Sequence, residues 1–320
     1  MPGALLWGED GAHWPHRTHS HFLQLSGQRW HVQRWAPPRP GAPTWLLLHG
    51  TGASTHSWRG LAPLLAAHVG LVAPDLPGHG FSGPAPIGRA GLEGMAQAVR
   101  MLLRELQLAP AASVGHSAGA AIAVRLRLRD DDNDARAATT PHTAGTAEAR
   151  HLLFGLNAAL LPLRGLAGTL FSPAAKLLAL NPLAPHFFSW HATQGRMLAR
   201  LLGSTGSQLD ADGMALYRRL IESPAHVAGA LAMMAQWDLP ALARDLPGLR
   251  TPLHLVVGEA DGTIPPADAP RVQALLPTAQ VHRLPGLGHL AHEEAPARVA
   301  ALLLRLAGLQ APPAASEHTQ

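Results

Sequence analysis

The sequence predicts a doubly wound α/β fold, with a mostly parallel central sheet, helices on both faces and an inserted helical cap. Short apolar runs alternate with stretches of helical periodicity, as in a parallel sheet that is covered on both faces. At 115–119 a serine stands between two glycines where an apolar run passes into a helical stretch. Between 158 and 235, proline-broken helical pieces interrupt the alternation, which indicates an insertion over the strand ends.

The first part of the core begins with a hairpin and continues as strands that alternate with helices. Ser26 and Gly27 supply the hairpin turn, and a continuous apolar run such as 44–48 is typical of a buried parallel strand. The expected elements are strands over 22–25, 29–35, 44–48, 69–73, 111–114 and 151–154, with helices over 58–67 and 92–106. The polar residues 127–150, which include Asp130–Asp134, predict an exposed mobile loop.

Four segments follow from these patterns. We expect the first part of the α/β core over 1–157, with the polar loop insertion 127–150, and a helical cap over 158–235. Pro162, Pro173, Pro182, Pro185 and Pro224 break the cap into short helical pieces. The second part of the core, 236–310, carries strands over 253–257 and 281–284 and helices over 267–276 and 290–306. Residues 311–320 form a Pro/Ala/Ser-rich tail that is expected to be disordered.

Composition indicates a packed globular protein, since 47% of the 320 residues are hydrophobic and 14% are charged. The isoelectric point of about 10.8 does not indicate a nucleic-acid partner. The net charge is only +4, and with one lysine, one tyrosine and no cysteine few groups titrate between histidine and arginine. No transmembrane run and no secretory start are visible, so we expect a cytoplasmic protein for which peripheral membrane contact stays open.

Neither a metal nor a cofactor is expected. Twenty histidines are present, and His13, His16, His19 and His21 lie close together, but no HExxH pattern accompanies them. The acidic run Asp130–Asp134 lacks the glycine and the terminal glutamate of a calcium-binding EF-hand loop. Hydrogen-bonded or exposed histidines and a solvated acidic run are the simpler interpretations.

The stretch Gly115-His116-Ser117-Ala118-Gly119 predicts a nucleophilic serine on a sharp turn between a strand and a helix. A serine at such an apex takes strained backbone angles, and the flanking glycines leave room for the strand and helix to pack together. The turn lifts the serine oxygen above the sheet edge, close to the first N–H groups of the helix. Ser117 is therefore the candidate nucleophile.

A serine nucleophile needs a base and a carboxylate that orients the base. Asp261 directly follows the strand 253–257 and is the candidate carboxylate, with Glu259 as the weaker alternative. His289 follows the strand 281–284 and two glycines and is the candidate base, with His292 as the alternative. In a parallel sheet the carboxyl ends of all these strands lie on one edge, where ligands bind.

Two backbone N–H groups are expected to stabilise the oxyanion of a tetrahedral intermediate. One belongs to Ala118, the residue after the nucleophile, and the other to Thr51, in the loop that follows the strand 44–48. Asp75 and His79 are expected to support loop structure and to take no part in the chemistry. Support of the serine turn and of the Thr51 loop is assigned to His49, Gly50, Gly115, His116 and Gly119.

Together these motifs resemble the α/β-hydrolase superfamily over nearly the whole chain, from about Phe22 to Leu306. The order serine, aspartate, histidine along the chain is the order found in that superfamily. Within it, the stretches 49–58, 115–123, 156–162 and 227–239 resemble the magnesium-chelatase accessory proteins of bacteriochlorophyll biosynthesis, found in phototrophic bacteria. The chain departs from that pattern at Arg127–Arg150, where those proteins have a shorter connection.

The triad predicts a serine hydrolase that acts on ester-type bonds. A carboxylesterase or a perhydrolase outside pigment synthesis would use the same triad, whereas serine at position 117 argues against dehalogenases and epoxide hydrolases, which place aspartate there. The resemblance implies a role at magnesium insertion into tetrapyrroles, with a small-molecule ester or tetrapyrrole-related substrate and magnesium-chelatase subunits as partners. A non-catalytic accessory protein that binds a porphyrin under the apolar cap is the alternative.

Overall fold

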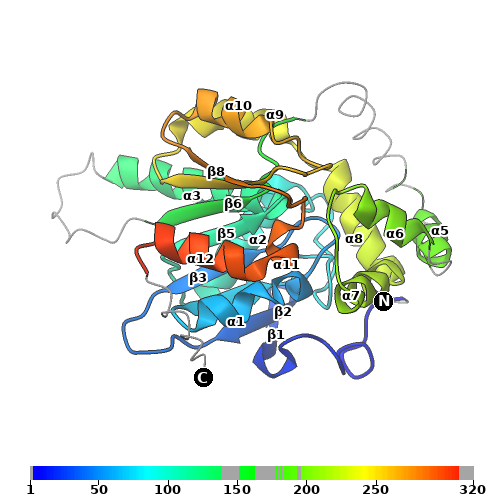
Figure 1. Cartoon of the computed structure of the whole chain (residues 1–320). Coiled ribbons are helices and arrows are strands. Elements are labelled where there is room, and N and C mark those ends of the chain that lie inside the picture. The colour runs from blue at the N-terminus through cyan, green and yellow to red at the C-terminus, as the bar shows by residue number, and fades with distance from the viewer. Residues whose placement is uncertain are drawn as a thin grey trace, which may run out of the picture.

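The computed structural model describes residues 3–137, 151–162, 178, 181, 183–192 and 196–309. Its centre is an eight-stranded sheet with the order β1-β2-β4-β3-β5-β6-β7-β8 (Figure 1). β2 runs antiparallel to both β1 and β4, and every other pair is parallel, which confirms the mostly parallel sheet. The strands are β1 (Ser20–Leu25), β2 (Gln28–Trp35), β3 (Thr44–Leu48), β4 (Gly70–Pro74), β5 (Ala112–His116), β6 (Leu152–Leu156), β7 (Leu253–Gly258) and β8 (Gln280–Leu284).

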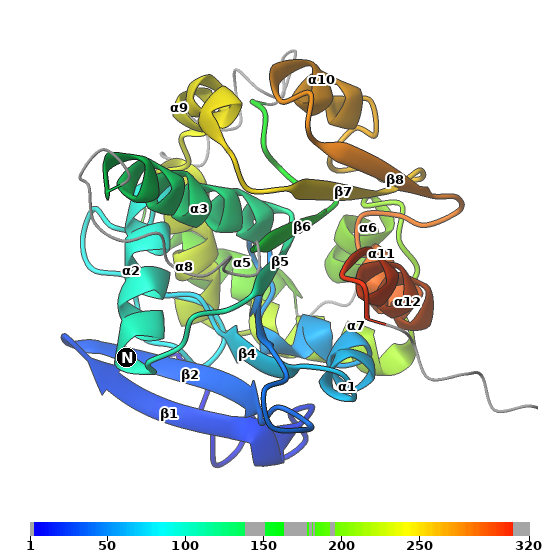
Figure 2. The ribbon, with the colours of Figure 1, turned by 90° about the vertical axis from the view of Figure 1, so that its left-hand side faces the viewer.

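Helices cover both faces of the sheet, as Figure 2 shows nearly edge-on. One face packs against α2 (Leu92–Glu105), α3 (Ala118–Ala137), α9 (Leu239–Asp245) and α10 (Asp268–Leu275). The other face packs against α1 (Leu61–Ala66), α11 (Ala291–Glu294) and α12 (Pro296–Leu306). Because both faces are covered, the central strands are apolar on both sides, and all five residues of β4 and of β5 are buried.

A group of helices between β6 and β7 lies at one end of the sheet, to the right in Figure 1. It comprises α5 (Ala184–Ala192), α6 (Arg196–Gly203), α7 (Ala211–Ile221) and α8 (Pro224–Ala235), and we call it the cap. Two of the prolines at which helical pieces were expected to break stand at the starts of helices: Pro185 is the second residue of α5 and Pro224 the first of α8. The first turn of a helix tolerates proline because its N–H groups have no intrahelical partner.

The expectation of a loop over 127–150 is wrong for its first part, because α3 continues to Ala137. Tertiary contacts stabilise this polar helical end. The carboxylate of Asp131 is buried and accepts hydrogen bonds from the backbone N–H groups of Arg250 (2.8 Å) and Thr251 (3.1 Å). The carboxylate also pairs with Arg127 one turn away, at 3.1 Å. The remainder of the insertion, 138–150, and the tail 311–320 lie outside the described residues.

The expectation of a single helix over 290–306 is also wrong. This stretch forms two helices, α11 and α12, that meet at Ala295. Pro296 begins α12, and a residue before proline avoids helical backbone angles, which is why Ala295 has φ −138° and ψ 61°. The helix expected from Trp58 is shorter too: a 3₁₀ turn over Thr55–Trp58 precedes α1. Among the described helices, none is both long and apolar enough to cross a bilayer.

Candidate active site

Ser117 lies at the apex of a turn that joins β5 directly to α3. Its φ of 51° is a left-handed conformation that costs a non-glycine residue energy and is held by its surroundings. The Ser117 N–H donates to the carbonyl of Leu156 (3.0 Å), and the Ser117 carbonyl accepts from the N–H groups of Ala120 (3.1 Å) and Ala159 (3.2 Å). The end of β6 and the start of α3 thus fix the backbone on which the serine stands.

The two glycines of the turn are required by close packing. A Cβ atom on Gly115 would lie 2.4 Å from the backbone of Ala120, and one on Gly119 would lie 2.0 Å from the carbonyl oxygen of Leu48. Both distances are far below van der Waals contact. Any side chain at these positions would therefore push the turn away from α3 or from β3.

Asp261 and His289 meet at the carboxyl ends of β7 and β8. His289 Nδ1 donates a hydrogen bond of 2.8 Å to Oδ2 of Asp261, and both side chains are buried. This bond fixes the imidazole tautomer with its proton on Nδ1, which leaves Nε2 as the proton acceptor. Two residues 28 positions apart thereby hold an imidazole in one orientation, as a proton-accepting base would require.

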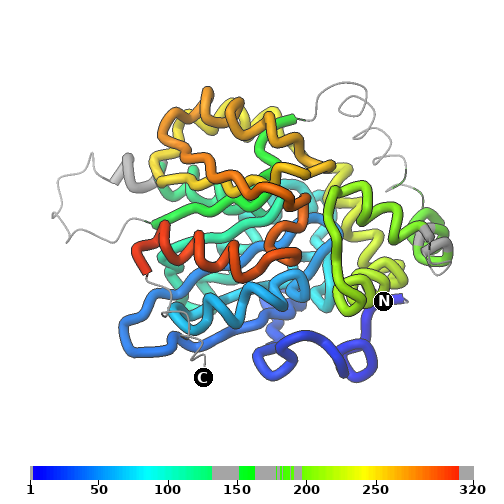
Figure 3. The backbone as a smooth tube through the Cα atoms, in the orientation of Figure 1, coloured from blue at the N-terminus to red at the C-terminus, as the bar shows by residue number. Residues whose placement is uncertain are grey.

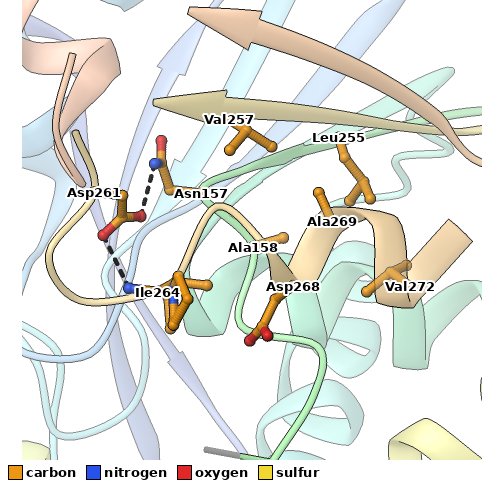
Figure 4. Close-up of a pocket in the computed structure, with 10 residues that line it drawn as sticks. Asn157, Ala158, Leu255, Val257, Asp261, Ile264, Asp268, Ala269 and Val272 are labelled. Atoms are coloured by element: carbon orange, nitrogen blue, oxygen red, sulfur yellow. Dashed lines mark hydrogen bonds between the residues drawn. The ribbon is translucent and has the colours of Figure 1, made fainter. Parts of the chain in front are cut away.

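Asp261 accepts three further hydrogen bonds. Its Oδ1 atom accepts from the N–H groups of Thr263 (2.7 Å) and Ile264 (2.9 Å), and Oδ2 accepts from the side-chain amide of Asn157 (2.8 Å). Figure 4 shows Asn157 and Ile264 on either side of the carboxylate. The cavity in that view measures about 20 Å³, room for about one water molecule. It lies behind the carboxylate and is far too small for an organic substrate.

Sequence reasoning missed Asn157. It follows β6 as Ser117 follows β5, and the register pairs His116 with Leu156, so the two residues are neighbours at the sheet edge. Asn157 has φ 46°, which asparagine adopts more readily than most residues. An asparagine directly after a buried parallel strand was the available signal.

The alternatives for the acid and base are placed differently. Glu259 is half-exposed and lies 3.9 Å from Arg283. His292 is fully buried on α11, where its ring packs against those of Trp58 and His116. Burial, helped by the nearby His289 ring, lowers the pKa of His292 to about 3, and neither of its nitrogens has a partner in the described part of the chain. Of the two histidines, only His289 contacts Asp261.

The loop expected to contain the second oxyanion donor packs against the serine turn. A Cβ atom on Gly50 would lie 3.2 Å from Cβ of Ser117 and 2.9 Å from Nδ1 of His116. The next residue, Thr51, donates its hydroxyl to Sδ of Met233 in α8 (3.5 Å). Ala118 is the first residue of α3, so its N–H has no intrahelical acceptor.

Buried histidines hold these loops in place. His49 donates from Nδ1 to the carbonyl of Gly50 (2.8 Å) and accepts at Nε2 from the N–H of Leu76 (2.9 Å). Burial lowers the pKa of His49, which matches a neutral ring with one donor and one acceptor nitrogen. His116 bonds through Nε2 to the carbonyl of His289 (2.9 Å). The residue before the serine thus supports the loop that carries His289.

No hydrogen bond joins the Ser117 hydroxyl to the His289 imidazole in this structure. The serine turn and the Asp261–His289 pair are held by separate sets of hydrogen bonds. The hydrogen bond from His116 Nε2 to the His289 carbonyl links the two. Catalytic hydrogen bonds in ligand-free sites are often long and tighten when substrate binds.

A cap helix and the core share a buried acidic group. The hydroxyl of Tyr217 on α7 donates to Oε1 of Glu293 on α11 (2.7 Å). Burial raises the pKa of Glu293 to about 8, and its second oxygen has no partner in the described residues. Burial and the neighbouring Glu293 also raise the pKa of Tyr217. Glu293 is thus protonated at neutral pH in the folded protein.

We expect Glu293→Gln to stabilise the protein increasingly as pH rises from 5 to 9. The folded state keeps the Glu293 proton up to about pH 8, whereas the unfolded chain releases it near pH 4, so the wild type loses stability across that range. Each unit of the pKa difference corresponds to about 1.4 kcal/mol. Thermal melts at several pH values measure the effect, with the exposed Glu222→Gln as control. If the melting temperatures of all three proteins changed equally with pH, a protonated Glu293 would be contradicted.

The mostly parallel sheet, the strained serine turn and the oriented histidine define the class of protein: the chain belongs to the alpha/beta hydrolase family, whose family model matches residues 45–302. It is 37% identical over 293 residues to the magnesium-chelatase 30 kDa subunit of Rhodobacter capsulatus, a match that covers 92% of this chain and 96% of that protein.

Two further comparisons concern hydrolases. A pimeloyl-[acyl-carrier protein] methyl ester esterase of Vibrio vulnificus is 29% identical over 74% of this chain and 84% of its own. The crystal structure of an alpha/beta hydrolase fold protein from Burkholderia ambifaria superimposes with a TM-score of 0.68 at 23% identity, covering 89% of this chain and 97% of that one. This structural likeness supports the fold alone.

Proposed function

We propose that the protein is a serine hydrolase that cleaves an ester-type bond, with Ser117 as nucleophile, His289 as base and Asp261 as the carboxylate that orients it. The observation that carries the proposal is the 2.8 Å hydrogen bond from His289 Nδ1 to Asp261, beside a serine held at φ 51°. The relationship to a methyl ester esterase supports ester chemistry. The contact between Ser117 and His289 forms in this proposal when substrate binds.

The reaction proceeds in two halves. The Ser117 oxygen attacks the carbonyl carbon while His289 Nε2 takes the hydroxyl proton, and the carbonyl electrons move to an oxyanion that accepts hydrogen bonds from the N–H groups of Ala118 and Thr51. The oxyanion collapses, the C–O bond to the leaving alcohol breaks, and the imidazolium gives that alcohol its proton. Water then repeats the sequence on the acyl-enzyme, and Ser117 is released.

The relatives support a substrate class without testing it. Likeness over nearly the full length to a magnesium-chelatase subunit supports a role at the magnesium-insertion step of tetrapyrrole synthesis. We therefore propose that the substrate is an ester of a tetrapyrrole, or an ester metabolised in the same pathway as a tetrapyrrole. Magnesium-chelatase subunits are the proposed partners.

Labelling with a fluorophosphonate probe tests the catalytic proposal, because the probe reacts with an activated serine hydroxyl. We expect the wild type to be labelled and Ser117→Ala to be unlabelled. Ser26→Ala is the matched control: Ser26 also has positive φ (48°) but lies in the exposed β1–β2 turn, so labelling should be unchanged. A folded wild type that the probe leaves unlabelled would overturn the proposal.

A second candidate function is a non-catalytic accessory role in assembly with chelatase subunits or in binding a tetrapyrrole. The observation that favours it is the exposed apolar surface of the cap. Leu183, just before α5, is 70% exposed, and Phe187 and Trp190 on α5 are 56% and 60% exposed. Large apolar side chains gathered at a surface often mark an interaction site.

Pigment synthesis separates the two functions. In a phototroph that lacks its own relative of this chain, Ser117→Ala is expected to lose both esterase turnover and bacteriochlorophyll. Normal pigment from a variant without esterase activity would favour the accessory role. Immunoblotting of both strains controls for equal protein levels.

A further inference from the structure

One backbone carbonyl of the cap accepts hydrogen bonds from both loops that carry the proposed acid and base. The carbonyl oxygen of Thr205, between α6 and α7, accepts from the N–H of Gly262 (3.0 Å) and from the N–H of His289 (3.1 Å). Gly262 directly follows Asp261. A single cap atom therefore links the backbone beside the acid to the backbone of the base itself.

The following cap residues continue these contacts. The buried hydroxyl of Ser207 accepts from the N–H of Leu290 (2.8 Å), the residue after the base. The N–H of Gln208 donates to Oε2 of Glu294 (3.3 Å), whose Oε1 accepts from the N–H of Gly288 (2.9 Å). Residues 288, 289 and 290 are thus each held, directly or through Glu294, by the segment Ser204–Gln208.

Three glycines allow the three backbones to approach this closely. A Cβ atom on Gly206, which has φ 76°, would lie 1.9 Å from the carbonyl oxygen of Ala260. One on Gly262 would lie 2.3 Å from the carbonyl oxygen of Ser204, and one on Gly288 would lie 2.4 Å from the carbonyl carbon of Gly206. At these three glycines, the cap, the Asp261 loop and the His289 loop therefore approach each other backbone to backbone. Figure 3 shows the α6–α7 connection passing beside the loop after β8.

We propose that Ser204–Gln208 is a positioning element of the active site: its Thr205 carbonyl and Ser207 hydroxyl set the His289 ring against Asp261. The inference rests on the proposed function, in which these two side chains act together. The cap is then part of the machinery as well as a cover. A displacement of this segment moves the acid and base loops apart, and misplacement of a reacting group by about 1 Å can cost about 10²-fold in rate.

The test compares two glycine substitutions in one stretch of the cap. Gly206→Ala places a methyl group against Ala260 and is expected to lower kcat for p-nitrophenyl butyrate about 10²-fold with little change in KM. Gly203→Ala is the matched control, because a Cβ atom there would meet nothing within 4 Å. It is expected to keep wild-type kcat and KM.

Ser207 supplies a second, milder test with a rescue. Ser207→Ala removes the acceptor of the Leu290 N–H and is expected to lower kcat about 5- to 10-fold, roughly the worth of one hydrogen bond. Ser207→Thr keeps the hydroxyl and is expected to restore at least half of the wild-type kcat. Circular dichroism verifies that each variant is folded. If Gly206→Ala does not fold, the comparison of Ser207→Ala with Ser207→Thr tests the positioning role.

A proton NMR readout separates this inference from the proposed catalysis. The His289 Nδ1 proton, shared with Asp261, should give a downfield resonance in the wild type and in Gly203→Ala, assigned by its loss in His289→Gln. The resonance should shift or broaden in Gly206→Ala and in Ser207→Ala, whether or not the wild type hydrolyses esters. If the folded variants keep the wild-type resonance, the positioning role is overturned. Where the wild type hydrolyses esters, the overturning result is an unchanged resonance together with an unchanged kcat.

Discussion

Replacing Asp261 by Asn is expected to lower kcat for ester hydrolysis about 10⁴-fold, the loss typical when a triad aspartate becomes an amide. The Asn oxygen would keep the two backbone N–H donors of Thr263 and Ile264. Its NH₂ group would then face His289 Nδ1, which must give up its proton to accept. The ring would carry that proton on Nε2, where a base needs a free lone pair.

Glu259→Gln is the control for this prediction. Glu259 is the alternative carboxylate that the sequence offers, it lies two residues away, and its side chain is half-exposed. Its replacement should leave kcat within a factor of about 2, in keeping with an exposed pair worth a few tenths of a kcal/mol. Assays at saturating substrate with matched melting temperatures measure both variants. If Glu259→Gln lost the activity and Asp261→Asn kept it, the assignment of the acid would be wrong.

Asp75→Asn is expected to reduce the free energy of unfolding by about 2–3 kcal/mol, because it leaves a buried hydrogen-bond donor without an acceptor. Asp75 is fully buried and accepts from the N–H groups of Thr55 (2.7 Å) and Phe81 (2.9 Å) and from Nδ1 of His31 (2.7 Å). An amide cannot accept all three, because its NH₂ group would face another donor. Denaturant unfolding measures the change.

The Asp75 effect should also depend on pH. Burial alone raises the pKa of Asp75, but the paired His31 and the hydrogen bonds outweigh it and hold the pKa well below its usual range. A carboxyl group with a depressed folded pKa stabilises the protein above its unfolded pKa, about 3.9, and loses that contribution as pH falls. The difference in the free energy of unfolding between wild type and Asp75→Asn should therefore narrow below about pH 4. Asp212 is exposed on α7, so the free energy of unfolding of the control Asp212→Asn should stay within about 0.5 kcal/mol of wild type. An Asp75→Asn variant as stable as this control would refute the structural role of Asp75.

The parallel sheet and the serine turn were readable from sequence because both depend on local patterns. Apolar runs such as Gly70–Pro74 and Ala112–His116 are buried on both faces, and this burial leaves a composition that no exposed strand would have. Gly115 is equally local, since its close neighbour Ala120 lies within the same strand–turn–helix unit. Asp261 and His289 could be singled out as residues that follow strands.

Long-range contacts explain the error at 127–137 and the site residues that sequence reasoning missed, whereas the break at Pro296 is a local effect. Residues 127–137 are too polar to predict helix by periodicity, yet the carboxylate of Asp131 on α3 is held by Arg250 and Thr251, more than 100 residues away. Likewise, Thr205 has no sequence signature for its contact with the loops of Asp261 and His289, and Asn157 has only its place directly after a buried strand. The Thr205 contact is made by a backbone carbonyl, which every residue type possesses.

By itself the sequence determined the order and burial of the strands and the residue types able to act as nucleophile, acid and base, because these depend on hydrophobic period and side-chain chemistry. Only the tertiary structure decided that His289, and not His292, contacts Asp261, and that the cap backbone joins their two loops. The physical reason is that hydrogen-bond geometry is set by distances of a few tenths of an ångström between segments far apart in the chain. Residue types specify which groups are available, and packing specifies which of them meet.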